Sequence, residues 1–83
     1  MSPGLDEEVE FRRELGERLF EARKHTGLSQ GRVAERLGVP RTAVSLVERG
    51  MRKVDALELS ILADLYGQSM DALAGRAPAQ PPA

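Results

Sequence analysis

The sequence predicts an all-α protein in which five helices form one small domain. Five glycines each follow a stretch of apolar residues at helical spacing, where a left-handed helix end favours a residue without a side chain. Polar residues that can cap a helix precede four of these stretches, and no segment shows the alternation of apolar and polar residues typical of a strand. A chain of 83 residues is long enough for one domain with a modest core.

The helix boundaries follow from these start and stop signals. The expected helices span residues 7–26, 30–37, 41–49, 56–66 and 70–74. Asp6, Ser29 and Ser69 stand where an N-cap side chain is wanted. Asp55 and Glu58 have the spacing of a capping box, in which each side chain satisfies a backbone N–H of the other residue. The terminating glycines are Gly27, Gly38, Gly50, Gly67 and Gly75.

The chain divides into three parts. Residues 1–10 are an acidic lead that includes the start of the first helix, and residues 11–75 carry the remaining helical pattern. The tail 76–83 is Pro-rich and has no apolar periodicity, so we expect it to be disordered.

Apolar residues at a period of about 3.6 predict the core. The expected core residues are Leu15, Leu19, Ala22, Leu28, Val33, Ala34, Leu37, Val44, Val47, Leu59, Leu62, Ala63, Tyr66, Met70 and Leu73. Gly16, in the middle of the first helix, costs about 1 kcal/mol relative to alanine. We therefore expect a second helix to cross closely at this glycine.

The net charge of −1 conceals a basic block between two acidic segments. Residues 1–21 hold seven acids and three bases, residues 22–53 hold eight bases and two acids, and residues 54–83 hold four acids and one base. A concentration of positive charge on one part of a small domain favours contact with phosphates. The alternative is a solvated surface on which the charges cluster by chance.

Composition argues against several other classes of protein. The chain has no cysteine, which excludes disulfides and thiolate metal sites and fits a reducing compartment. No apolar run approaches a membrane span, and the N-terminus has acids where a signal peptide has bases. His25 is the single histidine, most simply a surface residue. We expect a cytoplasmic protein without a membrane partner, cofactor, metal or enzymatic activity.

The segment from Gln30 to Gly50 has the spacing of a helix-turn-helix that reads DNA. Ala34 follows Gln30 by four residues, where two helices cross too closely for a larger side chain, and Gly38 stands in the tight turn. The residues expected to close the corner between the two helices are Val33, Leu37, Val44 and Val47. Each position has a separate steric reason, so the joint match is specific.

From Leu15 to Gly75 the chain resembles the phage-repressor and Cro type of helix-turn-helix, also called the XRE family. The matching pieces are LGERLFEAR, TGLSQ, VAERLGV, AVSLVERG and LADLYGQSMDALAG. The resemblance implies a compact, lambda-repressor-like domain of five helices that binds double-stranded DNA and regulates transcription. It also implies a structural ion pair between Arg23 and Glu48.

A recognition helix of this type reads base edges with its N-terminal half. The expected base contacts are Arg41, Thr42, Ser45 and Leu46, and the expected phosphate contacts are Gln30, Arg32, Arg49, Arg52 and Lys53. For Arg32, Arg52 and Lys53 the alternative is a solvated surface side chain. Leu46 departs from the family, where a long polar residue is common. We therefore do not infer from relatives which DNA bases this helix recognises. Pro40 stands where a Ser or Thr cap is common, and a proline at a helix start is tolerated.

Leu57, Ile61 and Leu65 form a second apolar stripe on the fourth helix, beside the core residues. The resemblance implies a homodimer on a palindrome, and this stripe is the candidate interface for it or for another protein. The alternative is that the N-terminal lead folds back over the stripe through Leu5, Val9 and Phe11.

The favoured hypothesis is a dimeric repressor with helix 41–49 in the major groove of a palindromic operator. Three settings remain open: a free-standing repressor, a restriction-modification controller, and an antitoxin that represses its own operon. The alternative from a different class is an antitoxin or interaction module that acts mainly by binding a partner protein. A toxin, a peptidase or another regulator are the candidate partners.

Overall fold

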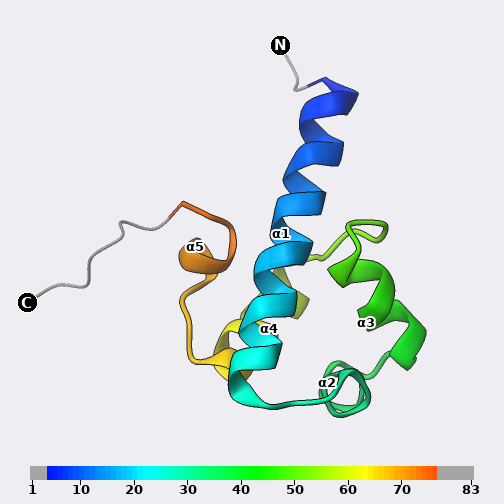
Figure 1. The fold of residues 1–83 in the computed structure, drawn as a ribbon, viewed down its shortest axis with the longest axis vertical. Helices are drawn as coiled ribbons and strands as arrows, with labels where there is room; N and C mark the ends of the chain where they lie inside the picture. The colour runs from blue at the N-terminus through cyan, green and yellow to red at the C-terminus, as the bar shows by residue number, and fades with distance from the viewer. Residues whose placement is uncertain (1–3, 77–83) are drawn as a thin grey trace, which may run out of the picture.

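The computed structural model describes residues 4–76, and within this range the chain is all α-helical (Figure 1). The helices are α1 (Leu5–Thr26), α2 (Gln30–Leu37), α3 (Arg41–Glu48), α4 (Ala56–Tyr66) and α5 (Met70–Leu73). The expected fold class is thus confirmed. The predicted tail lies outside the described residues except for Arg76.

The boundaries of α2 and α4 agree with the sequence prediction, whereas α1 begins earlier, at Leu5. The prediction that Asp6 caps this helix is wrong. Gly4 occupies the cap position, and its backbone N–H donates to Glu7 Oε1 at 2.9 Å. Asp6 instead lies in the first turn, where a negative charge stabilises the positive end of the helix. Helices α3 and α5 each end one residue before the expected position.

Helix α1 forms the axis of the molecule, with α2 and α3 on one side and α5 on the other (Figure 1). The N-terminal turns of α1 project beyond the other helices, so residues 5–10 of the acidic lead form the start of α1 instead of folding back over α4. The side chains of Leu5, Val9 and Phe11 are accordingly exposed. Among the described helices, none combines the length and apolarity that a membrane span requires.

The core lies where α1 packs on the other helices, and it is close to the predicted one. The buried apolar residues are Leu15, Leu19, Ala22, Val33, Ala34, Ala43, Val44, Val47, Leu62, Ala63, Tyr66 and Leu73. Leu28, Leu37 and Leu59 are partly buried against this cluster. The prediction for Met70 is wrong, because its side chain is exposed while Leu73 is fully buried. Arg18 of α1 fixes this end of the fold by donating from Nε to the carbonyl oxygen of Leu73 at 2.7 Å.

Gly16 allows α1 to touch the end of α3. A Cβ atom at this position would lie 2.6 Å from the carbonyl oxygens of Val47 and Glu48, which is closer than real side chains come. The close crossing expected from the sequence is therefore present, and it brings the C-terminal end of α3 against α1. Gly50, at φ 76°, makes a second close approach, since a Cβ atom there would lie 2.8 Å from Arg13 Cα. These two glycines fix α3 and the loop after it relative to α1.

Candidate nucleic-acid interface

Helices α2 and α3 form a corner through a tight turn. Ser29 caps α2, with its Oγ accepting from the Arg32 N–H at 3.1 Å. Gly38 ends α2 in the left-handed region at φ 72°, a conformation that strains residues with a side chain. Pro40 precedes α3 with φ −66° and supplies no side-chain cap. Apolar side chains of both helices are buried in the corner, as the helix-turn-helix spacing predicts.

Helix α3 presents two faces of different character. Its buried face consists of Ala43, Val44, Val47 and Glu48. On the other face, Arg41, Thr42 and Leu46 are exposed and Ser45 is half-buried. Arg49 follows the helix and is exposed as well. The four predicted base-contacting residues thus share the outward surface of one rigidly packed helix.

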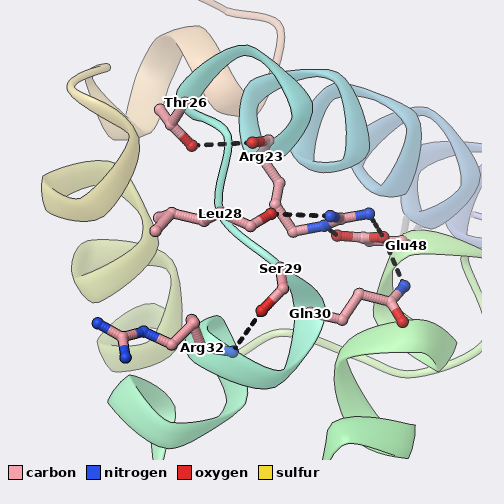
Figure 2. A network of polar contacts seen from close by, with 7 residues as sticks. All are labelled: Arg23, Thr26, Leu28, Ser29, Gln30, Arg32 and Glu48. Carbon is pink, nitrogen blue, oxygen red and sulfur yellow. Dashed lines mark hydrogen bonds and ion pairs between the residues drawn. The ribbon is translucent and has the colours of Figure 1, made fainter.

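A buried junction of Arg23, Gln30 and Glu48 holds α1, α2 and α3 together (Figure 2). Arg23 donates from Nε to Glu48 Oε2 at 2.6 Å and from Nη2 to Glu48 Oε1 at 3.1 Å. Its third contact is Nη1 to the Leu28 carbonyl oxygen at 2.9 Å. The Glu48 side chain is 4% exposed, so this bidentate pair is shielded from water. Arg23 and Glu48 are therefore parts of the fold.

Contacts and burial at this junction shift the pKa values of Arg23 and of the nearby Tyr66. The hydrogen bonds from Arg23 to the Glu48 carboxylate raise the pKa of Arg23 above its ordinary value, against the opposing effect of burial. Burial raises the pKa of Tyr66 to about 12, the Glu48 charge adds to this shift, and Arg23 opposes it. Both groups keep their usual charge near neutral pH.

Gln30 has a second role that the sequence did not reveal. Its side-chain Nε2 donates to Glu48 Oε1 at 2.9 Å, and Figure 2 shows the amide directed toward that carboxylate. Gln30 is expected to contact a phosphate, and one of the two N–H groups of its side-chain amide is thus already engaged within the protein. Gln30 and Glu48 are 18 residues apart, and no local pattern links residues at that separation.

The other predicted phosphate contacts differ in their exposure and in whether they already lie beside a carboxylate. Arg32 is exposed, and its side chain points away from the buried junction in Figure 2. Arg52 pairs with Glu58 through two contacts, at 3.3 and 3.2 Å, while Glu58 also accepts from the Asp55 N–H at the start of α4. Lys53 is highly exposed, with its Nζ 3.6 Å from Glu8 Oε1. The structure therefore does not present the predicted phosphate contacts as one set of unpaired side chains, because Arg52 and Lys53 already lie beside carboxylates.

The first turns of α2 and α3 contain no acidic residue, in contrast to α1, where Asp6, Glu7 and Glu8 occupy the first turn. The N-terminal end of a helix carries partial positive charge and N–H groups without helical partners. No carboxylate of their own first turns competes for these groups at the starts of α2 and α3, so both helix ends are compatible with a phosphate.

The second apolar stripe is graded in exposure along α4. Leu57 is 70% exposed, Ile61 is half-buried, and Leu65 packs against the core cluster. The uncovered part of the stripe thus lies at the N-terminal end of α4.

Comparisons with known proteins agree with this geometry. A family profile described as helix-turn-helix matches residues 19–73. The chain is 40% identical over 62 residues to the HTH-type transcriptional regulator ImmR of Bacillus subtilis (strain 168). That match covers 75% of this chain and 49% of ImmR, so the chain spans about half the length of this relative.

The solved structure of the restriction-modification controller protein C.AhdI from Aeromonas hydrophila superposes with a TM-score of 0.67 at 36% sequence identity. It covers 74% of this chain and 92% of the controller protein. The profile match, the shared sequence and the shared fold extend over the same helices that form the corner described above. On these grounds the chain belongs to the XRE-type helix-turn-helix family.

Proposed function

We propose that this protein is a sequence-specific regulator of transcription that binds double-stranded DNA with α3 in the major groove, acting as a dimeric repressor on a palindromic operator. The observation that carries the proposal is the outward face of α3, where Arg41, Thr42 and Leu46 are exposed on a helix whose opposite face is buried. Family membership and the similarity to a transcriptional regulator and a restriction-modification controller support a DNA-binding regulator of transcription. The proposal needs no cofactor, metal or catalytic residue.

Each outward residue suits a particular base contact. The Arg41 guanidinium matches O6 and N7 of guanine, and Thr42 or Ser45 can bond a base edge. Leu46 offers only an apolar surface, for which a thymine methyl group is the partner in the major groove. The operator is therefore expected to contain both a guanine and a thymine within the half-site read by one helix.

The flanking residues bind phosphates in this proposal. Arg32 and Arg49 are exposed and available, and the N-terminal end of α2 adds backbone N–H groups. Gln30 contributes the N–H that Glu48 does not hold. Arg52 and Lys53 must exchange their carboxylate partners for phosphate.

Binding-site selection from random DNA, followed by titration, tests the recognition surface. Arg41→Ala is expected to cost about 1–3 kcal/mol on the selected site and much less on random DNA, because a base contact is lost. Arg36→Ala, an exposed arginine of α2 that the proposal does not use, is the matched control. Equal losses on both kinds of DNA would make Arg41 a phosphate contact instead.

Dimerisation through the exposed end of the α4 stripe would place two recognition helices about 34 Å apart, one DNA turn. Leu57→Asp and Ile61→Asp are expected to give folded monomers with reduced operator affinity, because each charge would be buried at the interface. Leu57 is the cleaner site, since it is 70% exposed in the monomer. Sedimentation reports the mass, and folded variants that remain dimeric would place the interface elsewhere.

A second candidate function is an antitoxin or interaction module whose main ligand is a protein, such as a toxin, a peptidase or another regulator. Exposed apolar side chains on several elements favour it, among them Leu5, Met51 and Leu57. The two functions differ in their response to salt. DNA binding weakens steeply as salt rises because counterions are released, whereas a pure protein-binding module shows no salt-sensitive affinity for DNA.

A further inference from the structure

The first turns of α1 place an acidic residue beside the loop that follows the recognition helix. Glu8 Oε1 lies 3.0 Å from Arg12 Nη1 and 3.6 Å from Lys53 Nζ. We call Glu8, Arg12 and Lys53 the exposed junction. Lys53 belongs to the predicted phosphate contacts, and Glu8 is 45 residues away in the sequence. Tertiary packing therefore brings the Glu8 carboxylate next to the basic block of residues 22–53.

The fold holds the backbones of this junction in place. Gly50 packs so closely on α1 that a Cβ atom would lie 2.8 Å from Arg13 Cα. Glu8, Arg12 and Lys53 border one shallow groove whose apolar lining is Phe11, Leu15 and Val54. The approach of Glu8 to Lys53 is thus set by packing between α1 and the loop after α3.

We propose that Glu8 competes with DNA phosphates for Lys53 and so lowers the affinity of the protein for DNA. This inference rests on the proposed function. A carboxylate offers an ammonium group the same charge-assisted contact that a phosphate oxygen offers. DNA must therefore displace Glu8 before Lys53 can bind the backbone. Because the competitor acts on a phosphate contact, it weakens binding to every sequence alike.

The effect is modest because the junction is open to water. The side chain of Lys53 is 79% exposed and that of Glu8 is 44% exposed. Exposed ion pairs contribute little, so removal of the competing carboxylate should raise DNA affinity about two- to five-fold. The gain should shrink at high salt, where the ion pair is screened. Neutralising Glu8 should therefore make the salt dependence of binding steeper.

Titration of a random-sequence duplex with Glu8→Gln at several salt concentrations tests this proposal. Glu21→Gln is the matched control, since it removes the same charge from an exposed position further along α1. The informative comparison is a double-mutant cycle that combines Glu8→Gln with Lys53→Gln. Competition for Lys53 predicts that Glu8→Gln raises affinity in the wild-type background and loses most of this gain when Lys53 is absent.

Each outcome has a definite meaning. A gain that persists in the Lys53→Gln background, or that Glu21→Gln reproduces, overturns the proposal in favour of a general effect of net charge. Unchanged affinity of Glu8→Gln also overturns it. Wild-type protein that shows no salt-dependent binding to any duplex refutes the proposed function itself, which separates the two failures.

Discussion

The carboxylates of Glu48 and Glu8 each contact side chains from more than one part of the chain, Glu48 in the buried junction and Glu8 in the exposed junction. The two carboxylates differ most in their exposure to water. The side chain of Glu48 is 4% exposed and accepts hydrogen bonds from Arg23 and Gln30 at 2.6 to 3.1 Å. The side chain of Glu8 is 44% exposed and lies 3.0 Å from Arg12 and 3.6 Å from Lys53. Breaking a buried ion pair leaves an uncompensated charge, whereas an exposed pair is replaced by water. Contacts of a carboxylate with basic side chains therefore stabilise the fold at the buried junction. At the exposed junction the same kind of contact can be replaced by water or by another ligand.

The largest expected effect is at the buried junction. Glu48→Gln keeps the shape of the side chain but leaves the Arg23 charge without a partner, so it should lower the free energy of unfolding by about 3–5 kcal/mol. Denaturant titration measures this loss. Glu17→Gln, which breaks the exposed pair with Arg13, is the control and should change little. Similar losses for the two variants would mean that burial of an ion pair does not decide its contribution to stability in this protein.

Alkaline pH should also lower the stability of the fold, through the buried Tyr66 near the Arg23–Glu48 pair. The pKa of Tyr66 is raised from 10.0 to about 12 in the folded protein, chiefly by burial. A raised pKa means that the folded state retains a proton that the unfolded state loses. The contribution of the protonated Tyr66 to the free energy of unfolding is fully present below pH 10.0, and it is lost as pH rises toward about 12. Thermal melts across this range should show falling stability, and Tyr66→Phe should remove that component; an identical pH profile in the variant would contradict the assignment.

A smaller effect is expected for Gln30. Gln30→Met keeps the length of the side chain and removes its donor to Glu48, which should cost about 1 kcal/mol of stability. If the second N–H binds a phosphate, affinity should fall equally on the selected site and on random DNA. Lower stability with unchanged DNA binding would assign Gln30 to the fold alone. Reduced affinity without any loss of stability would assign it to DNA alone.

The smallest effect on stability belongs to the exposed junction. Glu8→Gln should change the free energy of unfolding by no more than about 0.5 kcal/mol, because both partners of Glu8 can be hydrated. Denaturant titration checks this at the same salt used for DNA binding. A loss comparable to that of Glu48→Gln would show that the two junctions are not different in kind.

Local signals predicted the helices well where capping residues are specific. Ser29 with Gly38 and Asp55 with Gly67 delimit α2 and α4 at the expected residues, since such caps act within a few positions. The cap position of Gly4 was not predicted, because glycine has no side chain that could mark it as a cap. Met70 was misplaced because α5 is a single turn, too short for a helical period to distinguish its buried side.

The helical periodicity that predicted the core also predicted the outward face of α3. It did not predict which side chains the basic residues contact. The contacts of Glu48 with Gln30 and of Glu8 with Lys53 join residues that only tertiary packing brings together. Arg52 pairs with Glu58 although they are six residues apart, because the loop before α4 turns back on the first turn of that helix. Sequence reasoning thus identified the basic residues but not which of them are already paired.

Recognition of DNA by the outward face of α3 is tested most directly by a nuclear magnetic resonance titration of isotope-labelled protein with its selected duplex. Backbone amide signals should shift most over Arg41 to Leu46 and at the start of α2, with smaller changes near Lys53. Signals of Leu57 and Ile61 should respond only through dimerisation. Shifts concentrated on α4, with those of α3 unchanged on a duplex that binds, would contradict the account.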